Sequence, residues 1–204
     1  MSHNKPHQLA TTRQLLDSAL VSTATKAVLE DRLQEKQTAP AFLDAASFRL
    51  LTILCRHLLA EEDGTRAARV AADIDARLAA NKSNGWRYQQ MPADRDAYAL
   101  ALKAMDETAR SNYQHAFADL STDKQLALLH QLQKGETGGE YWNKVSPLKF
   151  FEELLCEATE LYYSYPYALE EIGFAGIADA QGWKEIGLPQ EKEEDKQPAI
   201  TQLP

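Results

Sequence analysis

The residues of this chain that could do chemistry are its histidines, cysteines and paired carboxylates. No His-Glu-x-x-His segment is present, and no histidine follows a glutamate by three residues, so zinc-protease and di-iron spacings are missing. The absence of Cys-x-x-Cys argues against haem attachment and zinc ribbons. No Gly-x-Ser-x-Gly elbow or phosphate-binding glycine loop occurs. The sequence therefore predicts no catalytic, cofactor-binding or metal-ligating residue in this chain.

The remaining candidates have a structural explanation. The carboxylate pairs Asp73/Asp75 and Glu152/Glu153 occur in amphipathic stretches, where paired acids are typical of a solvated helix face. His57 lies beside the apolar positions of its predicted helix, which favours a hydrogen-bonded histidine at the edge of the core over a ligand. These residues give no separate indication of catalysis.

The two cysteines, Cys55 and Cys156, do not form a disulfide framework. Each has apolar neighbours at helical spacing, which predicts two small buried side chains. A bridge between them, or to another protein, is the alternative and would require an oxidising compartment.

Charge and length restrict the class of partner. The chain has 204 residues and a net charge of −8, which argues against binding to nucleic acid or to an anionic membrane surface. No apolar run approaches the roughly 20 residues needed to cross a bilayer, so we expect a chain that does not itself span a membrane. A chain of this length can bury a core without a metal or a disulfide.

Hydrophobic periodicity predicts helices and no strand of useful length. Apolar residues at four-residue steps, such as Val70, Ile74 and Leu78, mark buried helix faces. Asp44, Ser121 and the pair Ser146-Pro147 are helix-start signals, whereas Gly64 and Gly135 are helix-stop signals. Six helices are expected, over residues 13–33, 45–63, 66–80, 92–113, 122–134 and 147–165.

The last of these helices has a long apolar stripe, from which a core-facing side is predicted. Its members are Phe151, Leu154, Leu155, Ala158, Leu161 and Tyr162. Pro166 should end the helix at Tyr165 or just before it.

These elements predict an all-α fold: a single irregular helical bundle with an N-terminal helical arm and a C-terminal strap rich in glycine and tyrosine. Residues 1–40 form the arm, residues 41–188 the helical domain, and residues 189–204 a charged tail with the composition of a disordered segment.

The segment from Glu160 to Leu188 gathers four tyrosines and four glycines. One interpretation is a strap whose tyrosines fill core gaps and whose glycines turn the chain back over the bundle. The other is a recognition surface, because tyrosine and tryptophan bury a large area while keeping a polar tip. Both can hold together, and we predict a partner interface formed by Tyr162, Tyr163, Tyr165, Pro166, Tyr167, Gly182 and Trp183.

Five stretches in order along the chain carry a family resemblance. They are DAASFRLLTILCRHLLAEEDG (44–64), ARVAADIDARL (68–78), FADLSTDKQLALLHQLQKG (117–135), FFEELLCEATELYYSYP (150–166) and GWKEIGLP (182–189). Together they resemble the gluconate 2-dehydrogenase subunit 3 family, the small subunit of bacterial flavoprotein sugar dehydrogenases. The resemblance covers roughly residues 42–189, and its specificity lies in the order and spacing of the motifs.

The resemblance implies a non-catalytic partner of a large FAD-containing subunit of the glucose-methanol-choline type. A multihaem cytochrome c commonly accepts the electrons in such complexes, so haem c is expected in a third subunit. The small subunit is implied to support folding, assembly and export of the catalytic one, and to hold no cofactor itself. The substrate class implied for the complex is a sugar, sugar acid or glycoside.

The resemblance also implies export by a twin-arginine leader, and here the chain departs from the family. Arg13 followed by Leu15 and Leu16 matches part of such a leader, but the second arginine and the apolar core are missing. The expected location is the periplasm or the membrane surface, reached through partners. A cytoplasmic complex is the alternative.

Two other functions compete with the accessory subunit. One is a stand-alone helical enzyme or ligand-binding protein, with a pocket under residues 173–187. The other is a helical scaffold with different partners.

Overall fold

The computed structural model describes residues 16, 21–34, 39–61, 64–83, 85 and 91–172. Their regular structure is helical, with no β-strand among them, which confirms the predicted all-α class. The chain divides into two compact units. The first contains Met1–Gln34 and Tyr165–Pro204, and the second contains Glu35–Ser164.

Among the described residues, two helices belong to the first unit. Helix α2 (Thr23–Leu33) confirms the C-terminal half of the helix expected over residues 13–33, and Ser22 caps it by accepting from the Thr25 backbone N–H. Helix α8 (Pro166–Glu171) was not predicted, since a non-helical strap was expected there. Pro166 occupies its first turn, a position where the missing N–H costs no hydrogen bond. The two helices contact each other.

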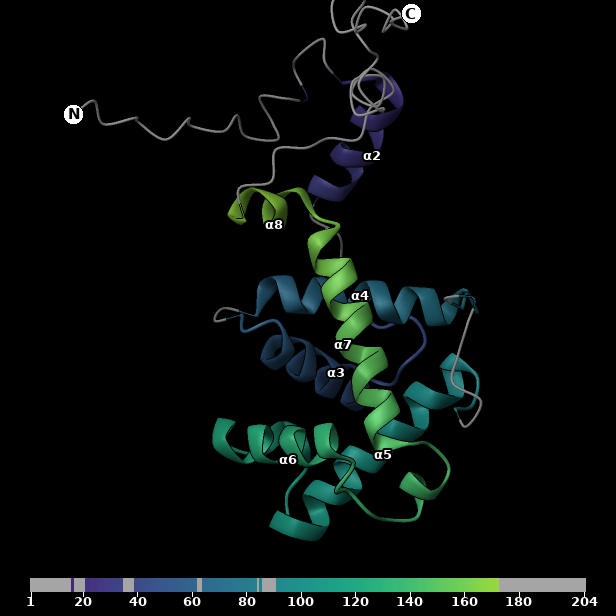
Figure 1. Ribbon diagram of the computed structural model, residues 1–204, viewed down its shortest axis with the longest axis vertical. Coiled ribbons are helices and arrows are strands. Elements are labelled where there is room, and N and C mark those ends of the chain that lie inside the picture. The colour runs from purple at the N-terminus through teal and green to yellow at the C-terminus, as the bar shows by residue number, and fades with distance from the viewer. Residues whose placement is uncertain are drawn as a thin grey trace, which may run out of the picture. The chain divides into compact units, whose positions relative to one another are not determined.

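The second unit holds the other helices, which Figure 1 shows with α7 running across α3 and α4. Its five α-helices are α3 (Ala45–Leu58), α4 (Thr65–Ala79), α5 (Asp94–Tyr113), α6 (Thr122–Lys134) and α7 (Pro147–Tyr163). Two 3₁₀ turns, η1 (Phe117–Asp119) and η2 (Tyr141–Asn143), join them. Helix α7 contacts each of the other four α-helices, so its inner side is central to the core.

Most predicted helix ends in this unit are confirmed. Asp44 caps α3 by accepting from the Ser47 N–H at 2.8 Å, and Ser146 caps α7, with Pro147 in the first turn. Gly135 ends α6 in the left-handed conformation that glycine tolerates best. Ser121 occupies the N-cap position of α6, but its side chain makes no capping bond.

The predicted role of Gly64 was wrong. Helix α3 already ends at Leu58, and Gly64, at a φ of +77°, is instead the residue immediately before α4. The side chain of Glu61 supplies the cap there, because it accepts from the backbone N–H groups of Arg66 and Ala67 at 3.0 Å. A carboxylate near a helix N-terminus also interacts favourably with the helix dipole.

The expectation that Asp73 and Asp75 mark a solvated face was wrong for Asp75, which is buried. Its carboxylate accepts hydrogen bonds from the backbone N–H groups of Ala41, Phe42 and Leu43. These donors belong to the segment just before α3, so Asp75 ties that segment to α4. A buried charge is tolerated here because backbone donors replace the water that it loses.

The core of this unit contains the apolar faces that the periodicity predicts. Val70, Ile74 and Leu78 of α4 are fully buried, as are Leu51 and Leu54 of α3. On α7, Phe151, Leu154, Ala158 and Tyr162 of the predicted stripe are buried. Leu155 was predicted on that stripe but is 37% exposed, because it lies at the edge of the buried side of the helix.

The two cysteines behave differently from each other. Cys55 is buried, as predicted, and burial raises the pKa of its thiol above the ordinary range. Cys156 was also predicted to be buried, but it is exposed on α7. Both are free thiols in the structure.

Candidate functional site

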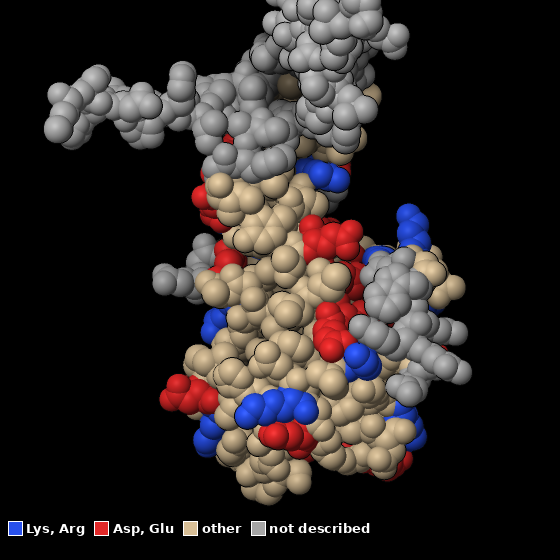
Figure 2. All heavy atoms as spheres, viewed as in Figure 1, with Lys and Arg blue, Asp and Glu red and all other residues tan. Residues whose placement is uncertain are grey.

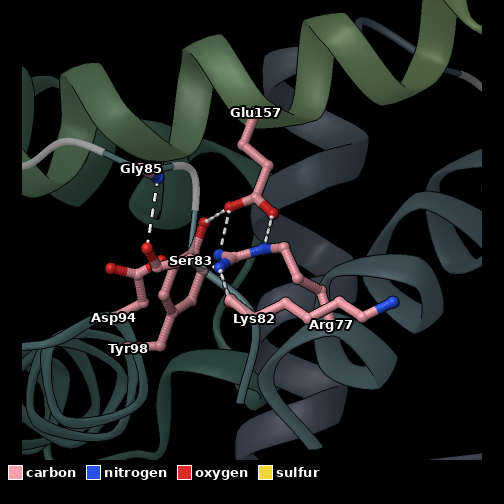
Figure 3. A network of polar contacts seen from close by, with 7 residues as sticks. All are labelled: Arg77, Lys82, Ser83, Gly85, Asp94, Tyr98 and Glu157. Atoms are coloured by element: carbon pink, nitrogen blue, oxygen red, sulfur yellow. Dashed lines mark hydrogen bonds and ion pairs between the residues drawn. The ribbon is translucent and has the colours of Figure 1, made fainter. Parts of the chain in front are cut away.

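The partly buried guanidinium of Arg77 connects α4, α5 and α7 (Figure 3). Nε and Nη2 of Arg77 donate to the two carboxylate oxygens of Glu157, at 2.5 and 2.8 Å. Its Nη1 donates to Asp94 Oδ2 at 2.6 Å and to the carbonyl oxygen of Lys82 at 2.7 Å. Such a bidentate pair fixes orientation as well as distance. The network therefore sets how α7 lies on α4 and α5.

Tyr98 completes the network from α5. Its hydroxyl donates to Glu157 Oε2 at 2.5 Å, and its ring packs edge-on against Phe150 with centroids 5.3 Å apart. Burial and the adjacent negative charge of Glu157 raise the pKa of Tyr98 well above its usual range, so the phenol remains a donor. Burial alone would lower the pKa of Arg77, but the hydrogen bonds and charge of Glu157 outweigh it and raise that pKa.

The network has a third carboxylate close by, that of Glu153 on α7. Burial, followed by the negative charges of Asp94 and Glu157, raises the pKa of Glu153 from 4.5 to about 6, against the opposing effect of Arg77. One guanidinium thus serves three neighbouring carboxylates. At neutral pH this edge of α7 carries excess negative charge.

The opposite side of α7 is apolar and exposed. Leu148, Leu155 and Tyr163 are 37%, 37% and 42% exposed, and all three fall within roughly 80° of one another around the helix axis. We call this surface, with Glu152 and Thr159 between the three, the outer face of α7. Figure 2 shows uncharged surface along one side of the path of α7, with acidic and basic groups along the other.

The outer face has little free charge. Glu152 pairs with Lys149 at 2.8 Å, one turn apart on the same helix. The Thr159 hydroxyl donates to the Leu155 carbonyl oxygen at 2.7 Å. Among the described residues, only Val28 and Ile172 are other large apolar side chains with comparable exposure, and neither is on α7. Helix α7 therefore concentrates exposed apolar area on one face, a feature typical of interaction surfaces.

The predicted interface tyrosines have different environments. Tyr163 is exposed, and its ring meets that of Tyr162 edge-on at 5.3 Å. Tyr162 is buried, and its hydroxyl accepts from Arg66 Nη1 at 3.2 Å. Tyr165 is also buried, and its ring stacks on that of half-buried Tyr167 at 5.2 Å.

The other predicted interface residues provide little further evidence on a partner interface. Pro166 is buried at the start of α8. Gly182 and Trp183 lie outside the described residues, as does the alternative pocket under residues 173–187. A contact of these predicted residues with a partner stays a prediction.

His57 has the environment that the sequence predicts. Its Nε2 lies 2.8 Å from Gln125 Oε1, an acceptor, so that nitrogen carries the proton. Gln125 in turn donates to the Phe117 carbonyl oxygen at 3.1 Å. The histidine therefore joins α3 to α6 and leaves no reactive group in a cleft.

A cleft of about 600 Å³ lies between the start of α3, the middle of α5 and η1. Its charges are largely paired: Arg49 with Asp119 at 3.0 Å, and Arg110 with Asp106 at 2.8 Å. Asp106 also accepts from the Phe117 backbone N–H at 2.9 Å. The Ser47 hydroxyl in the cleft donates to Asp44 Oδ2 at 3.1 Å, and that carboxylate caps α3 by accepting from the Ser47 backbone N–H, so the pair has a structural explanation.

Searches of the described residues returned two negative findings. No group of three or more His, Cys, Asp or Glu among them could hold a metal ion. None of the helices that they form combines the length and apolarity needed to cross a membrane.

Sequence reasoning missed the network. The available signal was a charge inside an apolar stripe, because Glu157 lies three residues after Leu154 and four before Leu161. Arg77 likewise directly precedes the buried Leu78. The pairing itself could not be predicted, since the two residues are 80 positions apart.

The architecture defines an all-helical subunit-like domain with an apolar outer face. A model of the gluconate 2-dehydrogenase subunit 3 family matches residues 45–189, and the chain belongs to that family. Comparison with curated proteins and with solved structures gave no significant match. The match covers all of α3 to α8 and confirms the family indicated by the five sequence stretches.

We expect Arg77→Met to lower the free energy of unfolding by about 3–5 kcal/mol, because it leaves Glu157 buried without its cation. Urea denaturation at pH 7.5 measures this. Adding Glu157→Leu to the variant should restore part of the loss, since no buried charge then remains unpaired. A loss below about 1 kcal/mol in the single variant would show that the network does not hold α7.

Glu153→Gln should change how stability depends on pH. The pKa of Glu153 in the folded chain, about 6, exceeds the ordinary 4.5. The contribution of Glu153 to the free energy of unfolding is therefore greatest below pH 4.5 and is lost as pH rises through 6. Because glutamine stays neutral, the variant should become more stable than the wild type as pH rises over this range. The difference in the free energy of unfolding should be no more than about 1 kcal/mol, since Glu153 is half-exposed. Urea midpoints at pH 4.5 and 7 test this, and a constant difference contradicts it.

Proposed function

We propose that this chain is the non-catalytic accessory subunit of a flavoprotein dehydrogenase complex that oxidises a sugar, sugar acid or glycoside. The observation that carries the proposal is the family match over residues 45–189. Subunit 3 of gluconate 2-dehydrogenase is by its name part of a dehydrogenase complex. The exposed apolar face of α7 supports a role in binding another subunit.

The mechanism proposed is physical. The chain binds the folded catalytic subunit and covers part of its apolar surface, which shifts the folding equilibrium of that subunit toward the native form. Binding only the native form stabilises it by about 2.7 kcal/mol at a hundredfold excess over Kd. The same contact supports assembly and export of the complex.

The proposed partner is a large subunit of the glucose-methanol-choline type, and the FAD belongs to it. A c-type cytochrome with haem c would take the electrons from the flavin. This chain supplies no cofactor ligand and contributes surface only. The complex is proposed to work in the periplasm or at the membrane surface, held there by its partners.

Co-expression tests this proposal. The FAD-containing large subunit from the same genome is produced with and without this chain, and the yield of flavin-loaded protein is measured from its visible absorbance. We expect the yield to rise several-fold with the chain present. Tyr163→Ala combined with Trp183→Ala should lower that gain, because both are predicted interface residues.

The isolated chain provides the control. It should be colourless and unable to oxidise sugars, and the purified double variant should keep the helical circular dichroism of the wild type. Equal flavoprotein yield with and without the chain would contradict an accessory role. Sugar oxidation by the chain alone would contradict a non-catalytic one.

A further inference from the structure

The exposed apolar residues of α7 lie at intervals along one side of the helix, and we call this row the stripe. Leu148, Leu155 and Tyr163 span about 22 Å of helix, at 1.5 Å per residue. The same helix buries its opposite side, where Glu157 is fixed by Arg77 and Tyr98. The orientation of the stripe is therefore set by a rigid element, which lowers the entropy lost when a partner binds.

One edge of the stripe is acidic. Glu153, Cys156 and Glu160 follow one another at three- and four-residue steps and form a row along α7. The row borders the stripe at Tyr163, which Glu160 precedes by three residues, whereas Glu153 lies about 160° around the helix from Leu155. Lys149 begins this row, but it pairs with Glu152. Glu160 is exposed, and Glu153 lies near the carboxylates of Asp94 and Glu157, so this edge repels anions and attracts cations.

We propose that the outer face of α7 is the docking site for the dehydrogenase's catalytic subunit, which meets it with an apolar ridge bordered by Lys or Arg. This proposal rests on the accessory role proposed above. Leu155 lies at the centre of the stripe and Tyr163 at its C-terminal end. The basic side chains of the partner lie against Glu160, which is one turn from Tyr163.

Charge argues against the other occupants. A second copy of this chain would bring an identical acidic edge and a further net charge of −8. The chain's own residues after 172 carry six acidic and three basic side chains, so they too have the wrong sign. A partner with basic residues balances the negative charge at the exposed Glu160, whereas these two occupants add to it.

Leu155→Glu tests the apolar contact. The wild-type chain is co-expressed with the tagged catalytic subunit, and the affinity of the purified pair is measured by titration. We expect Leu155→Glu to weaken binding by about tenfold or more, because it places a charge at the centre of the contact. Val28→Glu on α2 is the control, since Val28 is 51% exposed but not on α7, and it should bind like the wild type.

Glu160→Gln tests the acidic edge, with Glu30→Gln on α2 as its control. Because Glu160 is exposed, Glu160→Gln should leave the stability of the free chain unchanged, but it should weaken binding several-fold at low salt and reduce the salt dependence of the affinity. A purely structural role for Glu160 would not weaken binding in a stable variant. Unchanged affinity at low salt would overturn the proposed basic border of the partner.

The outcomes separate this inference from the accessory role. If the wild-type chain binds the catalytic subunit and Leu155→Glu binds equally well, the docking site lies elsewhere although the accessory role stands. If the wild-type chain does not bind, both fail. If the chain alone is a dimer that Leu155→Glu dissociates, the occupant is a second copy and the proposal is overturned.

Discussion

The guanidinium of Arg77 holds three helices of the second unit in one arrangement. It binds Glu157 of α7 through two parallel hydrogen bonds and Asp94 of α5 through a third, while itself belonging to α4. Apolar packing alone would allow α7 to rotate or slide by a fraction of a turn, because leucine and phenylalanine contacts have little directionality. The bidentate geometry removes that freedom. It fixes which side of α7 is buried and which side is exposed.

This constraint determines which apolar residues of α7 remain exposed. A helix that contacts four neighbours would be expected to bury most of its apolar residues, yet Leu148, Leu155 and Tyr163 remain exposed together. The chain's own packing leaves 37% of Leu148, 37% of Leu155 and 42% of Tyr163 uncovered. In a member of a dehydrogenase subunit family, surface that the chain leaves uncovered is available to another subunit.

Much of the fold could be predicted because helix signals are local. Asp44, Ser146-Pro147 and Gly135 each act within one turn, so their positions in the sequence were sufficient to place α3, α6 and α7. The predictions that were wrong concern residues whose burial depends on contacts between distant segments. Asp75 is buried because backbone N–H groups more than 30 residues away bind it, and Leu155 is 37% exposed because it lies at the edge of the side of α7 that the other helices cover. The candidate site was only partly predicted for the same reason: Tyr163 is exposed as an interface residue requires, whereas the neighbouring Tyr162 fills the core.

The most direct measurement uses the two cysteines of the chain as reporters. Cys156 is exposed on the acidic edge of the outer face, and Cys55 is buried in α3. The chain is treated with iodoacetamide alone and in complex with the catalytic subunit, and alkylation at each cysteine is followed by mass spectrometry. If the outer face of α7 docks the partner, Cys156 should react readily in the free chain and much more slowly in the complex, while Cys55 stays unreactive in both. Equal alkylation of Cys156 in the free chain and in a verified complex would contradict the account.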